Sequence, residues 1–168
     1  ASPWVLRRWP LSDGSVACLI IFLLLHTLGG RYTYSNLPYD EWASKWFGVT
    51  LSAHAGWERN HYDRLVHFAF GALAVRPVLE VLTRYWGVTS RVAMYLVLEC
   101  VLAVSAVYEI FEWLLTLAAA GALANDYNGQ QGDLWDSQKD MALAFAGALV
   151  GLAVSSARSI MKASARTP

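Results

Sequence analysis

Four long stretches of the chain are dominated by apolar residues, and polar segments separate them. They cover about residues 13–30, 63–83, 91–120 and 137–157. The first has an uncharged apolar middle, and the second, although it carries His67, Arg76 and Glu80, still repeats apolar residues at helical spacing. About 20 apolar residues cross the hydrocarbon core of a bilayer as a helix. The pattern therefore predicts an all-α fold, a polytopic transmembrane helical bundle of about four helices that forms one membrane domain over residues 1–168.

The fourth stretch is rich in Ala and Gly, and Gly147 and Gly151 stand four residues apart in it. Small residues at this spacing let the backbones of two helices approach closely. We therefore expect the fourth helix to pack tightly against a neighbouring helix.

The composition agrees with a membrane location. Hydrophobic residues make up 56% of the chain and charged residues 15%, whereas about 25% of an ordinary soluble domain is charged. The 13 basic and 13 acidic residues leave no net charge, so nucleic acid is not an expected partner. Eight Trp and eight Tyr, many beside apolar runs, fit aromatic belts at the level of the lipid head groups. The expected surroundings are a lipid bilayer.

The basic residues predict the orientation of the bundle. With four spans, the N-terminus, the loop around Arg84 and Arg91, and the C-terminal tail lie on one side, and all three carry Arg or Lys. Loops rich in Lys and Arg remain in the cytoplasm, so the termini and the middle loop are expected there. The loops over 31–62 and 121–136 then face outward, and the second of them contains no Lys or Arg.

This orientation brings ionisable residues of three helices to the outer end of the bundle. They form three pairs at spacings of three or four residues: Asp63 and His67, Glu109 and Glu112, Asp136 and Asp140. Residues at these spacings lie on one face of a helix. We expect the three pairs to point toward a common place.

Several carboxylates in a medium of low dielectric constant must either take up protons or find cations. A divalent metal (Zn, Fe or Mn) is one solution, because facing helices of a bundle can hold such ions with carboxylate and His ligands. Its expected ligands are His67, Glu109, Glu112, Asp133, Asp136 and Asp140. One alternative is an ion-pair network in which Arg31, Arg59 and Arg64 neutralise Asp63, Glu109, Glu112 and the acidic loop over 121–136. The other is a protonatable transport path through the membrane.

Further residues near this end are candidates for other roles. His61 and Asp63 are the catalytic candidates, as acid or base groups, while Arg64 and Gln131 are expected contacts of an anion or a lipid head group. The loop that holds Gln131 leads into the fourth helix, and backbone N–H groups at the start of a helix favour anions. The chain contains no Gly-rich phosphate loop, dinucleotide fingerprint or Ser-His-Asp order, so the sequence does not decide whether the protein is an enzyme.

Four sequence strings resemble the YjdF family of bacterial inner-membrane proteins. They are HTLGGRYTY at 26–34, RNHYDRLVHF at 59–68, YEIFEW at 108–113 and GxQGDxWDxQxDM at 129–141. The resemblance implies a small multi-pass helical bundle in the bacterial inner (cytoplasmic) membrane and a further hydrophobic segment upstream of Ala1. It implies no reaction, because the family is a domain of unknown function.

Three functions remain open at this point. The leading hypothesis is a metal or polar-ligand site that opens to the outer face and acts on a lipid head group or another amphiphile. The second is a non-catalytic accessory subunit of a membrane complex, whose aromatic loop over 32–57 and Gly147/Gly151 face meet other membrane subunits. The third is a proton- or ion-coupled carrier that uses Glu99 and the outer carboxylates.

Overall fold

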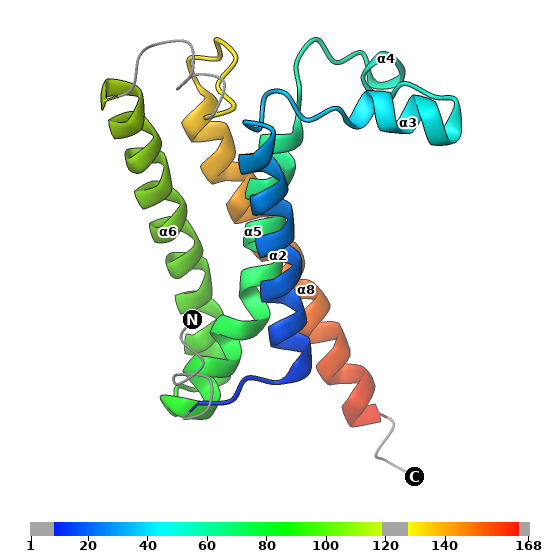
Figure 1. Cartoon of the computed structure of the whole chain (residues 1–168). Helices are drawn as coiled ribbons and strands as arrows, with labels where there is room; N and C mark the ends of the chain where they lie inside the picture. Colours follow the sequence, from blue (N-terminus) through cyan, green and yellow to red (C-terminus); the bar gives the residue numbers. More distant parts are fainter. Residues whose placement is uncertain (1–8, 119–127, 165–168) are drawn as a thin grey trace.

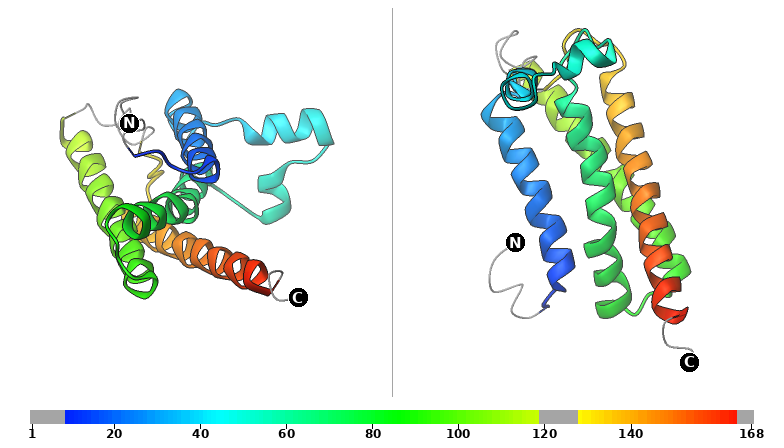
Figure 2. Two further views of the ribbon diagram at one scale, coloured as in Figure 1. Left: turned by 90° about the horizontal axis from the view of Figure 1, so that it is seen from below. Right: turned by 90° about the vertical axis from the view of Figure 1, so that its right-hand side faces the viewer.

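Four long helices run side by side and form the body of the protein (Figures 1 and 2). The structure, a computed structural model, describes residues 9–118 and 128–164, with the side chains of the last helix described as far as residue 157. The long helices are α2 (Asp13–Arg31), α5 (Tyr62–Glu80), α6 (Ser90–Ala118) and α8 (Asp136–Ser164). A single π-helical turn, η1 (Val81–Tyr85), continues α5, and two short helices, α3 (Tyr39–Phe47) and α4 (Leu51–Ala55), lie between α2 and α5.

All four long helices are long and apolar enough to cross a membrane. The predicted all-α bundle of about four transmembrane helices is therefore confirmed, and no strand occurs among the described residues. The second predicted span ends within η1, so that α5 and η1 together make a segment of 24 residues. The predicted end of the third span, at residue 120, lies outside the described residues, as does most of the loop expected over 121–136.

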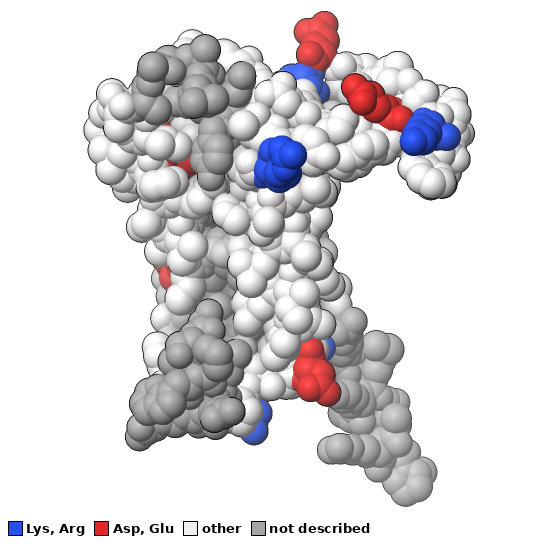
Figure 3. Space-filling view, in the orientation of Figure 1, with Lys and Arg blue, Asp and Glu red and all other residues white. Residues whose placement is uncertain are grey.

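The charged side chains lie mainly near the two ends of the bundle. On the face drawn in Figure 3, most Lys, Arg, Asp and Glu atoms are seen near the ends, and few interrupt the middle. A middle zone with few charges is what a hydrocarbon layer favours, because exposed charge there is costly. We call the end where α5 and α8 begin, and where α2 and α6 end, the acidic end.

The tightest helix contact is between α5 and α8, and glycine makes it possible. A Cβ atom on Gly71 of α5 would collide with the backbone carbonyl of Ala144, and one on Gly147 of α8 would collide with the carbonyl of Phe68. A Cβ on Gly151 would lie only 2.7 Å from the carbonyl oxygen of Ala72. The predicted close approach at Gly147 and Gly151 is thus confirmed. Because this face is covered by α5, it is not an outward surface for another subunit.

The segment between α2 and α5 is more ordered than a simple loop. Its helices α3 and α4 project sideways from the acidic end (Figure 1). Each ends at a glycine with positive φ, Gly48 at 70° and Gly56 at 67°. Residues 31–62 were expected to form a loop, because both helices are far too short to be predicted as membrane spans. We call residues 39–57 the aromatic arm, since Trp42, Trp46 and Phe47 are exposed on it.

Candidate functional site

Four carboxylates and one imidazole converge inside the acidic end. We call them the carboxylate cluster: Asp63 and His67 of α5, Glu109 and Glu112 of α6, and Asp140 of α8. All five side chains are buried, with between 2% and 7% of each residue exposed. Residues four or three positions apart share a face of a helix, so Asp63 and His67 point the same way from α5, and Glu109 and Glu112 the same way from α6. Three helices thus direct these ionisable groups toward one interior position.

His67 lies at the centre of this cluster. Its Nε2 atom is 3.7 Å from Oδ1 of Asp63 and 3.6 Å from Oε1 of Glu109. The ring of Tyr108 meets the His67 ring edge-on, with 5.8 Å between their centroids. This aromatic contact limits the positions that the imidazole can take.

The donor atoms of the cluster fit a metal ion. Ligand atoms of Asp63, His67 and Asp140 lie within 4.8 Å of one another, and so do those of His67, Glu109 and Glu112. His67 belongs to both groups. One imidazole and several carboxylates, drawn together by separate helices, form a ligand set that Zn, Fe and Mn accept.

Each carboxylate of the cluster also has an oxygen without a hydrogen bond in the described part of the chain. These buried atoms are Oδ2 of Asp63, Oε1 of Glu109, Oε1 of Glu112 and Oδ1 of Asp140. A buried acceptor that is left unpaired costs about 1–3 kcal/mol, and more when it is charged. Four such oxygens in one place are the arrangement that a bound cation would stabilise.

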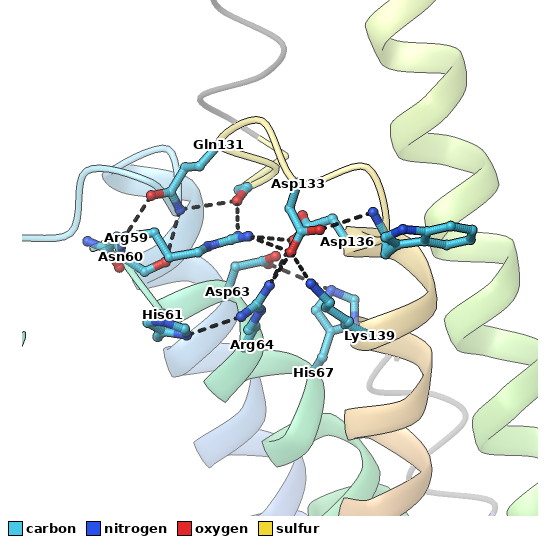
Figure 4. A network of polar contacts seen from close by, with 12 residues as sticks. Arg59, Asn60, His61, Asp63, Arg64, His67, Gln131, Asp133, Asp136 and Lys139 are labelled. Atoms are coloured by element: carbon cyan, nitrogen blue, oxygen red, sulfur yellow. Dashed lines mark hydrogen bonds and ion pairs between the residues drawn. The ribbon is translucent and has the colours of Figure 1, made fainter. Parts of the chain in front are cut away.

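A separate ion-pair network covers the cluster (Figure 4). Arg59 donates to Oδ1 of Asp136 at 2.9 Å and to the carbonyl of Gly129 at 2.6 Å. Arg64 donates to Oδ2 of Asp133 at 2.6 Å, and Lys139 donates to the same oxygen at 2.6 Å. The network ties the start of α5 to the segment that leads into α8.

Two predicted metal ligands, Asp133 and Asp136, therefore lie in the ion-pair network. Neither belongs to the groups whose donor atoms come close enough for a metal. Of the expected ion-pair network, the part at the acidic loop is present, because Arg59 and Arg64 pair with these two residues. In the described part of the chain no Lys or Arg pairs with the carboxylate cluster. The two arrangements lie next to each other and are made by different residues.

The segment before α8 closes over Asp63. Gly129 has a φ of 73°, and a Cβ atom there would lie 2.7 Å from the Asp63 carboxylate. The Asn128 amide donates to the backbone carbonyl of Glu112 at 2.9 Å and to the hydroxyl of Thr116 at 2.8 Å. These contacts hold the segment against α5 and α6, so that it separates the carboxylate cluster from solvent at the acidic end.

The remaining predicted site residues lie at the edge of this region. Figure 4 places His61 on the far side of Arg64 from Asp133, and the His61 ring stands 4.7 Å from that of Trp57. Partial burial lowers the pKa of His61, and the positive charges of Arg64 and Arg59 lower it further. Both effects favour the neutral form of its imidazole, and His61 lies outside the carboxylate cluster.

Gln131 has a structural contact of its own. Its side chain accepts a hydrogen bond from the backbone N–H of Asn60 and donates to the backbone carbonyl of the same residue, both at 2.9 Å. It thereby joins the segment before α8 to the segment before α5. Its predicted role as a head-group contact remains a prediction.

The network also changes the acidity of Asp133. Hydrogen bonds from Lys139 and from the backbone N–H of Trp135, together with the charge of Arg64, lower its pKa to about 2 from an ordinary 3.8. Asp133 therefore stays ionised at any pH above about 3.

Sequence reasoning missed Ser105, Tyr108 and Asn128. Ser105 stands one helical turn before Glu109 on the same face of α6, and it is 1% exposed. That spacing could have identified Ser105. No pattern in the sequence indicated the contact of Asn128 with α6, because this contact depends on how the segment before α8 folds back.

The chain is similar to known membrane proteins. A family model described as "Predicted membrane protein (DUF2238)" matches residues 1–160. The inner membrane protein YjdF of Escherichia coli strain K12 is 37% identical to the chain over 144 residues, which are 85% of this chain and 65% of that protein. The chain thus spans about 65% of the length of this relative. No solved structure matches.

Proposed function

Because the chain belongs to the DUF2238 family of predicted membrane proteins, as its resemblance to YjdF implied, we propose that it holds a divalent metal ion in the carboxylate cluster of its membrane bundle. The metal would act on a polar ligand, such as a lipid head group, that reaches the acidic end. The description of the family supports the membrane location. The metal and its use are our inference from the geometry.

The observation that carries this proposal is the set of four buried carboxylate oxygens without hydrogen bonds around His67. Like charges that are close together in a low-dielectric interior repel strongly. A divalent cation at their centre removes this repulsion and supplies the partners that the oxygens lack. The proposed ligands are Asp63, His67, Glu109, Glu112 and Asp140, with Asp133 and Asp136 assigned to the ion-pair network.

A metal in this position would supply Lewis acidity, which polarises an oxygen of a ligand or lowers the pKa of a bound water. The surrounding residues have their own tasks. Arg59 and Arg64 hold the covering segment in place through Asp133 and Asp136. Tyr108 packs on the ring of His67 and so fixes the direction of its nitrogen atoms.

Metal analysis of the purified protein tests the proposal. The protein is stripped with a chelator in a nonionic detergent, incubated with Zn²⁺, Mn²⁺ or Fe²⁺, and freed of excess metal. We expect stoichiometric binding of one of these ions and a higher melting temperature, since a ligand at 100 times its Kd stabilises the folded state by about 2.7 kcal/mol. Glu112→Gln and Asp140→Asn should each abolish both effects.

A matched control is available on the same helix. Glu99 of α6 is exposed and outside the cluster, so Glu99→Gln should bind metal like the wild type. The proposal is wrong if the wild type takes up none of the three ions and none of them changes its melting temperature.

The acidic end is proposed to face outward. The support is the placement of Arg84 and Arg91 at the opposite end of the bundle, which the positive-inside rule assigns to the cytoplasm. In a chain whose Cys18 and Cys100 are replaced by Ser, a membrane-impermeant thiol reagent should label Asn36→Cys in intact spheroplasts. Thr89→Cys, at the other end, should be labelled only after the membrane is opened. The reverse result would invert the orientation.

A second function is favoured by the aromatic arm. Trp46 is 74% exposed and Phe47 is 79% exposed, and exposed aromatic side chains of this size suit either a lipid interface or another membrane subunit. If the protein is an accessory subunit, a partner should co-purify in mild detergent and be lost when Trp46 and Phe47 are changed to Ser. A monodisperse chain without a partner would count against this function.

The carrier hypothesis receives no comparable support. Glu99 stands ten residues before Glu109 on α6, about 15 Å along the helix. It lies on the exposed surface of that helix, where its carboxylate is hydrogen-bonded to Tyr95. Between these two residues α6 carries no Asp, Glu, His, Lys or Arg.

A further inference from the structure

An apolar cavity extends from the carboxylate cluster into the membrane-spanning part of the bundle. Its volume is about 270 Å³, and residues of α2, α5 and α6 line it. Phe22, Val66, Phe70 and Val104 are among the residues that form its walls. Small-molecule sites have volumes of about 300–1,000 Å³, so this cavity is sized for a slender ligand.

The cavity borders the lipid-facing surface of the bundle. Leu23 of α2 and Val104 of α6 line it, and they are 57% and 53% exposed. At the depth of a transmembrane span these exposed side chains meet hydrocarbon and not water. A ligand would therefore enter sideways from the bilayer, between α2 and α6.

The end of the cavity next to the carboxylate cluster, which we call its inner end, is polar. Asp63 and His67, which belong to the carboxylate cluster, line it together with Ser105. Oγ of Ser105 is buried and forms no hydrogen bond in the described part of the chain. A hydroxyl group of a ligand would supply the partner that this serine lacks, because a hydroxyl can both donate and accept. A carboxylate head group would instead be repelled by the neighbouring acidic residues.

We propose that this cavity binds the hydrocarbon chain of a hydroxyl-bearing, single-chain amphiphile of the bilayer and brings its hydroxyl group to Asp63, His67 and Ser105. The inference rests on the proposed function in one respect, since the hydroxyl would arrive beside the proposed metal. The apolar walls and the volume of about 270 Å³ suit a single hydrocarbon chain. The unpartnered hydroxyl of Ser105, beside Asp63 and His67, selects a hydroxyl group.

Photolabelling tests the proposal. The protein is placed in phosphatidylcholine nanodiscs and irradiated with a dodecanol that carries a diazirine on its chain, and the labelled residues are identified by mass spectrometry. We expect labelling to concentrate on the cavity-lining parts of α2, α5 and α6. Unlabelled dodecanol should compete with the probe, whereas dodecane and dodecanoate should compete poorly.

Two matched pairs of variants separate the cavity from the general lipid surface. Val104→Phe and Leu23→Trp should block the cavity and reduce cavity labelling about tenfold, equivalent to about 1.4 kcal/mol of binding free energy. Val107 and Leu24 are also exposed, at 66% and 65%, but they do not line the cavity. Val107→Phe and Leu24→Trp should therefore leave the labelling unchanged. Equal melting temperatures within each pair would exclude misfolding as the cause.

A third variant tests the recognition of the hydroxyl. Ser105→Ala removes the donor at the inner end, and dodecanol should then lose its advantage over dodecane as a competitor. Labelling that is spread evenly over the lipid-facing residues, or that is unaffected by Val104→Phe and Leu23→Trp, would overturn the inference. Metal binding without cavity labelling would overturn this inference alone, and cavity labelling in a protein that binds no metal would overturn only the metal proposal.

Discussion

The hydroxyl of Ser15 donates a hydrogen bond to Oε2 of Glu80 at 2.5 Å, across 65 positions of the chain. The same carboxylate accepts bonds from the hydroxyl and the backbone N–H of Ser12, the residue that caps α2. The last turn of α5 thus holds the first turn of α2, at the end of the bundle opposite the carboxylate cluster.

Replacing Glu80 should loosen α2. We expect Glu80→Ala to lower the free energy of unfolding by about 1.5–3 kcal/mol, the range for hydrogen bonds to a charged group, as measured by thermal unfolding in detergent. The control is Arg84→Ala, because Arg84 is 53% exposed where it pairs with Glu80 and such pairs contribute about 0–1 kcal/mol. An equal loss in both variants would show that the bonds to Ser12 and Ser15 do not stabilise α2.

The contact between α5 and α8 should not accept even one methyl group at its centre. Gly71→Ala would drive a Cβ atom against the backbone of Ala144. We expect the free energy of unfolding to fall by at least about 1–3 kcal/mol, the usual cost of overpacking. Gly30→Ala is the matched control in α2, since its Cβ would meet open space. Gly30→Ala should leave the stability unchanged or raise it slightly. A Gly71→Ala protein as stable as the wild type would contradict this account of the helix contact.

Acid should weaken the ion-pair network in a defined range of pH. The pKa of Asp133 is lowered to about 2 in the folded state from an ordinary 3.8, so its contribution to stability is complete above about pH 4 and is lost as the pH falls toward 2. The difference in melting temperature between wild type and Asp133→Asn should therefore shrink over this interval. Glu41→Gln, on the exposed part of α3 and outside the network, serves as the control for the loss of a surface carboxylate. A constant difference would mean that the folded protein does not favour the charged form of Asp133.

Removal of metal should reverse the effect of a neutral substitution in the cluster. In the presence of a chelator we expect Glu112→Gln to unfold at a higher temperature than the wild type, because it removes one of several buried groups of like charge. With saturating metal the order should invert, since only the wild type gains binding energy. If the variant is less stable under both conditions, Glu112 supports the fold through neutral contacts and not as a ligand.

The local pattern of residues was sufficient for the membrane helices and for the convergence of the polar pairs on α5 and α6. A hydrophobic stretch long enough to cross a bilayer has few alternatives to a helix, because its backbone polar groups must be satisfied internally. The spacing of Glu109 and Glu112 likewise fixes a common face on α6. The spacing of Gly147 and Gly151 also places them on one face of α8, and the close packing expected there appears in the structure.

Only the tertiary structure decided which charged residues belong together. Asp133, Asp136 and Asp140 follow one another at short intervals, yet the first two pair with Arg59 and Arg64 while Asp140 turns inward toward His67. That division depends on the path of the backbone around Gly129 and on which residues α5 and α6 place opposite α8. Contacts between distant segments are set by packing in three dimensions, and the spacing of residues along a single helix carries no information about them.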